Sequence, residues 1–163
     1  MKSHPMTFEA EVKLAKQQFE MFRPSPDGMV PIVRTTSRVG QDRVALLAGL
    51  DSPEERLEAL VGLTIEHQAV RMVSLADTWV RILEPGEAIP EGRVRDDPHR
   101  GEALVVSLVT VPRIKVGSYP YLVLDGKVVW DEDTTVLEDD VRTQVEGMYK
   151  AVQNTMLLIS LAH

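Results

Sequence analysis

The sequence predicts a single α+β domain over residues 1–163, with a mainly antiparallel, twisted sheet of five to six strands and helices packed mostly on one face. Amphipathic stretches with helical periodicity lie near both ends and in the middle of the chain. Runs rich in β-branched residues fill much of the second half. Two apolar runs flank Asp125-Gly126, a dipeptide typical of a tight hairpin between antiparallel strands.

The expected element order is α-β-β-α-β-β-β-β-α. A helix is expected over residues 7–22, because apolar side chains recur there at alternating steps of four and three residues, and Thr7 can cap it. Extended segments over residues 29–35 and 43–49 flank a polar connection, so we expect them to pair as a hairpin. Pro31 favours an edge position, since proline cannot donate to a strand ladder.

The middle of the chain predicts a capped helix and then a long strand. Ser52 can cap a helix over residues 53–66, with proline at its first position and Glu55 completing a capping box. Residues 69–83 carry apolar side chains at both parities, which is typical of a central strand covered on both faces. A loop rich in proline and acidic residues follows over 84–101.

The last third predicts a strand over residues 102–111, a hairpin over 121–130 and a long helix over 138–161. The final turns of this helix are apolar on all sides. Three leucines lie off the stripe that we expect to face the sheet, namely Leu157, Leu158 and Leu161. We therefore expect them to be covered by another layer or by another subunit.

Composition excludes several classes of protein. The chain has no cysteine, which excludes disulfides, thiolate metal sites and a cysteine nucleophile. No apolar leader and no window of about 18 apolar residues occurs, so we expect a cytoplasmic protein without a membrane span. The net charge of −7 argues against nucleic-acid binding, because an acidic protein repels the phosphate backbone.

The strong catalytic and cofactor motifs are missing from the sequence. It has no phosphate-binding P-loop, no dinucleotide fingerprint, no nucleophile elbow and no His-Glu-x-x-His helix. The acidic stretch 131–135 opens like a calcium loop but then departs from it, with Val136 at the glycine position and Arg142 at the final ligand position. We therefore expect no metal and no cofactor, and a binding protein rather than an enzyme.

One alternative hypothesis is a metal-assisted hydrolase. It would use four residues, Glu66, His67, Asp77 and His99, because two imidazoles and a carboxylate can hold zinc or iron with an open position for water. The alternative for both histidines is a structural role, at a helix end and on a loop surface. For Asp77 it is an ion pair with Arg71 or Arg81, or a hydrogen bond from a backbone donor.

A second alternative is a small-anion or nucleotide site. Arg34, Arg38 and Arg43 cluster around the polar connection between the first two expected strands, with hydroxyl side chains between them. Guanidinium forks and hydroxyls suit a phosphate or a carboxylate. The same pattern also occurs on solvated hairpins, where each arginine pairs with a nearby carboxylate.

The stretch Val70-Arg-Met-Val-Ser-Leu-Ala-Asp-Thr-Trp79, the acidic loop and then His99-Arg-Gly-Glu-Ala-Leu-Val-Val106 resemble a pattern in small uncharacterised bacterial and phage-encoded proteins. Asp77-Thr78 stand where Glu-Ala is the commoner form in that group. The resemblance covers about a quarter of the chain. It implies an α+β fold and an accessory role, and it implies no activity.

The leading hypothesis is a non-enzymatic, self-associating interaction protein of bacterial or phage origin. The two terminal helices carry surplus apolar side chains, including Phe8, Phe19 and Phe22 on the first and the three off-stripe leucines on the last. A two-fold homodimer through these helices would bury them, and a different protein partner remains open. The competing interpretation places the last helix between the sheet and the first helix.

Overall fold

The computed structural model describes residues 5–22, 31–49, 52–81, 83–88, 90–92, 96–111, 113–132, 134–137 and 144–162. These residues form three helices and seven strands, which confirms the predicted α+β class. In chain order the elements are α1 (Phe8–Phe22), β1 (Ile32–Ser37), β2 (Asp42–Leu46), α2 (Pro53–His67), β3 (Ala69–Val80), β4 (Gly101–Thr110), β5 (Ile114–Leu124), β6 (Lys127–Trp130), β7 (Thr135–Leu137) and α3 (Gln144–Leu161). No helix among the described residues is long and apolar enough to cross a membrane.

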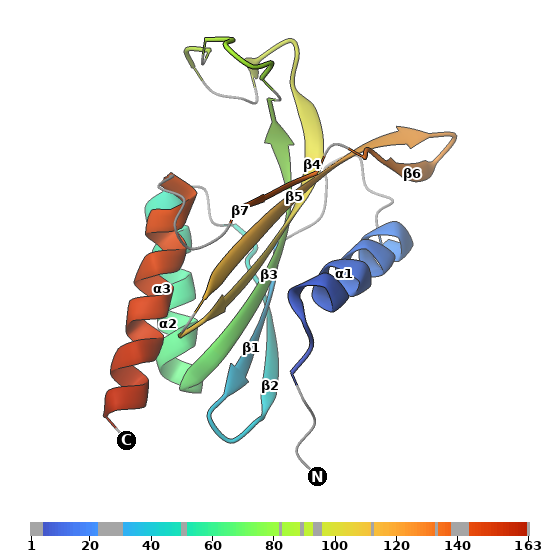
Figure 1. Ribbon diagram of the computed structural model, residues 1–163. Coiled ribbons are helices and arrows are strands. Elements are labelled where there is room, and N and C mark those ends of the chain that lie inside the picture. Colours follow the sequence, from blue (N-terminus) through green and yellow to red (C-terminus); the bar gives the residue numbers. More distant parts are fainter. Residues whose placement is uncertain are drawn as a thin grey trace.

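All strand pairs of the sheet are antiparallel, and the strand order is β2-β1-β3-β4-β5-β6, with β7 also pairing β5. The centre is the long β3–β4 pair, which runs in unbroken register from Arg71–Thr110 to Val80–Gly101. The loop between these strands extends beyond one end of the sheet (Figure 1). The prediction of five to six strands is thus close, with β7 as an additional short strand.

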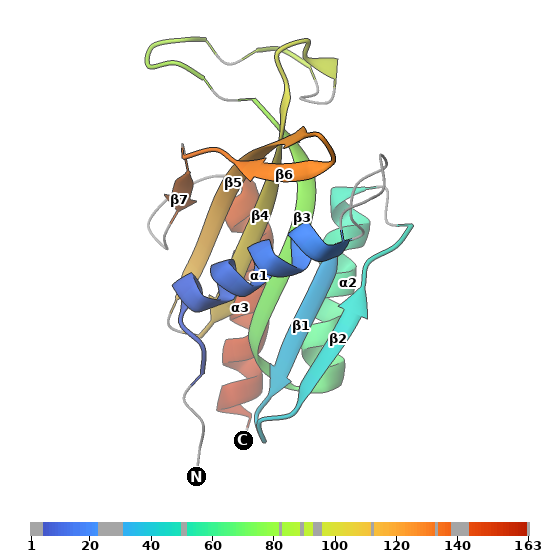
Figure 2. The same cartoon turned by 90° about the vertical axis from the view of Figure 1, so that its right-hand side faces the viewer.

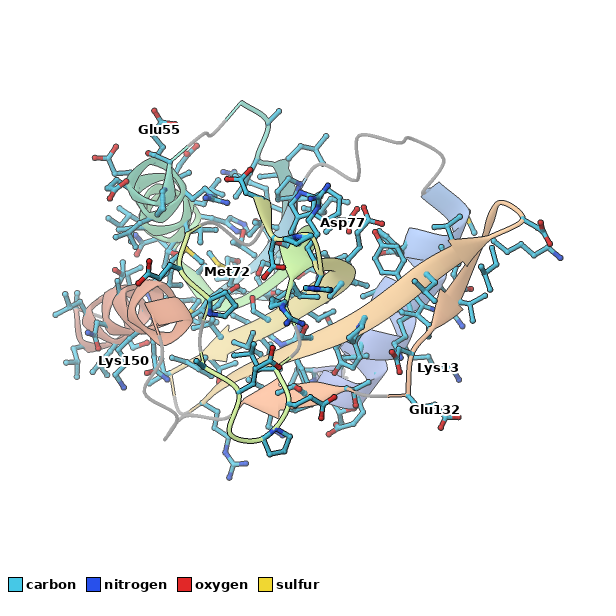
Figure 3. The ribbon with its side chains drawn as sticks, turned by 90° about the horizontal axis from the view of Figure 1, so that it is seen from above. Lys13, Glu55, Met72, Asp77, Glu132 and Lys150 are labelled. Carbon is cyan, nitrogen blue, oxygen red and sulfur yellow. The ribbon has the colours of Figure 1, made fainter. Side chains whose placement is uncertain are left out.

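The helices lie on both faces of the sheet, two on one face and one on the other (Figures 1 and 2). Side chains alternate along each strand, so the sheet divides the core in two. On one face α1 packs against Val73, Leu75, Leu104 and Val106. On the other face α2 and α3 pack against Val33, Met72 and Val109, and Figure 3 shows Met72 between the strands and this helix pair. The competing interpretation, in which α3 lies between the sheet and α1, is therefore wrong.

Local signals act as predicted at three places. The Thr7 hydroxyl oxygen accepts from the Ala10 N–H at 3.1 Å, and the Ser52 hydroxyl oxygen accepts from the Glu55 N–H at 3.1 Å. Asp125 and Gly126 both have positive φ, 51° and 75°, as a type I′ hairpin turn requires.

The largest departure from prediction is β5, which begins at Ile114 instead of residue 121. Its first half contains Gly117 and Pro120, which are poor strand formers. Gly117 is required because a Cβ there would lie 2.6 Å from Cε2 of Tyr119, whose ring covers the glycine. Residues 138–143, where the last helix was expected to begin, lie outside the described residues.

Candidate functional site

The four residues of the hydrolase hypothesis do not meet. His67 ends α2, two residues before the first residue of β3, and its Nδ1 lies 2.7 Å from the Thr35 hydroxyl. His99 is exposed in the loop beyond the last residue of β3, where its N–H donates to Asp97 at 2.8 Å. Strand β3 has 12 residues, so the end near His67 and the end near His99 lie roughly 35 Å apart. No group of three metal-ligating side chains occurs among the described residues.

Asp77 has a partner that the sequence did not predict. The Tyr121 hydroxyl donates to its Oδ1 at 2.6 Å, across the intervening strand β4. Arg81 instead holds the following loop, where it donates to Glu87 at 2.6 Å and lies 3.2 Å from Asp97. Asp77 and Arg81 are therefore structural links, one within the sheet and one to the loop.

The three arginines of the anion hypothesis do not converge either. Arg34 lies on the α1 face of β1 and pairs with Glu11. Arg43 stands opposite Thr35 in the register, so it lies on the other face, where it reaches Glu66 at 3.5 Å. Arg38 is exposed in the turn between β1 and β2. Two of the three guanidinium groups are thus paired with carboxylates, on opposite faces of the sheet.

Sequence reasoning missed a buried ionic cluster beneath α1. Glu11 is buried, although it lies in the first turns of a surface helix, and it contacts Arg34 and, at 3.9 Å, Arg71. Arg71 also donates to the Met6 carbonyl at 2.7 Å. Burial lowers the pKa of Arg71, and the Glu11 carboxylate opposes that effect. The signal was its spacing, since Glu11 lies three residues after Phe8 and four before Ala15 on the buried stripe.

The candidate functional site is an apolar surface on α3. Leu157, Leu158 and Leu161 are 42%, 67% and 75% exposed, while the stripe that includes Val152 and Met156 is buried. Together with exposed Asn154, the three leucines form what we call the α3 outer face. From residue 151 to residue 162 the helix carries no charged side chain. Lys150, just before this stretch, points away from α2 (Figure 3).

The α3 outer face differs from the exposed face of an ordinary surface helix, which carries charged residues opposite the buried stripe. Isolated exposed leucines are common, but three within two turns of a charge-free stretch of helix form a contiguous apolar strip. The first helix offers no comparable surface, since Phe8 and Phe19 are buried against the sheet. The side chain of Phe22 lies outside the described residues.

The chain matches no protein-family model, no curated protein and no solved structure with which it was compared.

Proposed function

We propose that this chain is a non-enzymatic interaction protein that self-associates through the α3 outer face. The observation that carries the proposal is the exposure of Leu157, Leu158 and Leu161 in a charge-free stretch of helix. A cytoplasmic location, a bacterial or phage origin and an accessory role stay predictions from the sequence. The N-terminal helix is no longer part of the proposed interface, because Phe8 and Phe19 are buried in the core.

The spacing of the outer face suits a helix that packs against a second helix. Asn154, Leu157 and Leu161 follow one another at steps of three and four residues, as the a and d positions of a helix pair do, and Leu158 lies beside them on the same outer face. A polar residue such as Asn154 within such a seam favours one register over others. In a two-fold dimer, this strip would pack against the same strip of the second copy.

Charge also favours a second copy at this place. The chain has a net charge of −7, so two copies repel each other over most approaches. Acidic side chains concentrate in the loop after β3, in the first turns of α2 and in residues 131–140 of the sequence, whereas the last three turns of α3 are neutral. Contact through the end of α3 therefore brings few charges of the same sign close together. Salt at physiological concentration screens the remaining repulsion between the two copies.

The expected pair is weak and concentration-dependent. The three leucines are 42% to 75% exposed, and burying the exposed part of each contributes about 1–2 kcal/mol, so two copies supply six such contributions. The total is comparable with the cost of association, about 4–15 kcal/mol. We therefore expect dissociation within the micromolar range of protein concentration.

The test compares two leucine-to-glutamate variants at positions of nearly equal exposure. Leu158→Glu places a charge on the α3 outer face, and Leu122→Glu places the same charge on the β5–β6 hairpin, where the leucine is 65% exposed against 67% for Leu158. Light scattering after size exclusion should give dimers for the wild type and for L122E, and monomers for L158E. A monomeric wild type, or equal loss in both variants, would refute the proposed interface.

A further inference from the structure

The outer strand β2 leaves one edge of the sheet open. It pairs with β1 on one side, and no described strand pairs with its other side. The opposite edge differs, because it is formed by two short strands, β6 of four residues and β7 of three, which pair with different parts of β5. Two apolar side chains of β2, Val44 and Leu46, are 62% and 65% exposed. An open edge with exposed apolar residues is the usual template for pairing with another segment.

The register identifies which backbone groups of β2 are open. The Leu47 N–H donates to the Pro31 carbonyl at 2.9 Å, so residue 47 points its N–H toward β1. In an antiparallel ladder this direction alternates along the strand. Residues 43 and 45 therefore also point toward β1, whereas Asp42, Val44 and Leu46 point their N–H and C=O groups outward.

An apolar cavity of about 210 Å³ lies beside this edge, on the face that carries α1. Its walls include Leu14 and Gln18 of α1, Ile32 and Arg34 of β1, and Val44 of β2. Figure 2 shows β2 outside the area of the sheet that α1 covers. A side chain on a strand added next to β2 would pass over Val44 into this space.

We propose that β2 binds an extended peptide segment of a partner protein as an additional strand, with one long apolar side chain of the peptide in the cavity. Backbone hydrogen bonds at such an edge supply affinity, and a pocket for an alternate side chain supplies selectivity. The cavity walls are apolar apart from Gln18 and the ion pair between Glu11 and Arg34, so leucine, methionine or phenylalanine fits there and an additional charged side chain does not.

A second copy of this chain fits the edge less well. If two β2 strands paired around Val44, the side chains facing the cavity would be Val44, Asp42 and Leu46 of the second copy. Valine directly opposite Val44 is too short to pass over it, and Asp42 already accepts from the Thr36 hydroxyl at 2.6 Å. A foreign segment with a longer side chain at the central position fills the cavity, which a second copy leaves empty.

The probe is the blocked peptide Thr-Val-Thr-Phe-Thr-Val-Thr, with an alanine-centred peptide as its control, added to the isotope-labelled full chain. Nuclear magnetic resonance should show amide shifts at Asp42, Val44 and Leu46 and near Leu14. The phenylalanine peptide should bind at least about tenfold more tightly than the alanine peptide, because its ring loses contact with water. Hydrogen exchange of the three outward amides should be fast without peptide and slower with it.

Two N-methylated forms of the same peptide test the backbone hydrogen bonds without any substitution in the protein. Methyl groups on the amides that face β2 should abolish binding, while methyl groups on the alternate amides should leave it unchanged. Absent or scattered shifts, equal binding of the phenylalanine and alanine peptides, or equal binding of both methylated forms would each overturn the proposal. Protection of the outward amides without peptide would instead indicate pairing with a second copy, and would also overturn it. Because L158E leaves β2 untouched, that variant should bind the peptide as the wild type does, whatever its oligomeric state.

Discussion

Removal of the Glu11 carboxylate is expected to destabilise the fold far more than removal of any neighbouring surface charge. Its side chain is only 2% exposed, and the side chains of Arg34 and Arg71 are 25% and 12% exposed. In Glu11→Ala two half-buried cations would face each other without the anion between them. Removing one member of a buried ion pair costs about 3–5 kcal/mol.

We expect a loss of about 3 kcal/mol for Glu11→Ala, at the lower end of that range, because Arg34 keeps some contact with water and Asp42 supplies a further negative charge near Arg71. For a domain of this size, that loss lowers the melting temperature by about 6–12 °C. Urea unfolding followed by circular dichroism measures the free energy of unfolding directly.

The control is Glu9→Ala, which removes an exposed glutamate from the same first turns of α1. It should change the free energy of unfolding by no more than about 0.5 kcal/mol. The double variant Glu11→Ala with Arg34→Ala should lose less free energy of unfolding than the two single variants lose together, because removal of either partner already breaks the pair. The reasoning fails if Glu11→Ala costs no more than Glu9→Ala.

Three further changes test other parts of the structure. Gly117→Ala should cost about 1–3 kcal/mol in urea unfolding, because its Cβ would collide with the ring of Tyr119, and adding Tyr119→Ala should remove most of that increment. Ser52→Ala should cost about 1 kcal/mol by the same assay through loss of the α2 cap, and Ser52→Asp should restore it; a neutral Ser52→Ala contradicts the cap. Burial, and then the Glu9 carboxylate, raise the pKa of Tyr119, so the free energy of unfolding should fall as pH rises above the ordinary tyrosine value of about 10. Tyr119→Phe should flatten that fall, and an unchanged pH profile contradicts the assignment.

The elements that the sequence predicts well are those whose signals are local. The Ser52 cap and the Asp125-Gly126 turn act within a few residues, so they hold whatever the rest of the chain does. The first half of β5 was missed because its stability comes from pairing with β4 and from the Tyr119 ring over Gly117. Both contributions depend on tertiary structure, which local propensity does not include.

The same distinction applies to the charged residues. Glu11 has the sequence context of an exposed glutamate. Its partners, Arg34 and Arg71, lie on strands and follow it by 23 and 60 positions in the chain. Arg34 and Arg43 are close in sequence, but the β1–β2 register places them on opposite faces. A one-residue change in that register would have placed them together, and the sequence alone does not define it.

The leucines of α3 were identified from periodicity alone, since residues off the buried stripe of a helix must point elsewhere. Their exposure confirms that part of the reasoning. The sequence left open whether α1 covers them, and the position of α1 on the opposite face of the sheet excludes that arrangement. We propose that a second copy of the chain covers them in solution.

The most direct test of that proposal is chemical cross-linking through single cysteines, since the natural chain contains none. Asn154→Cys places one thiol within the α3 outer face and leaves the three leucines in place. Leu124→Cys places one at the exposed end of β5, where the β5–β6 hairpin extends on the side of the molecule away from α3 (Figure 1). With a short bismaleimide at micromolar protein concentration, N154C should form a covalent dimer and L124C should stay monomeric. Equal cross-linking of both variants, or none with N154C, would contradict self-association through α3.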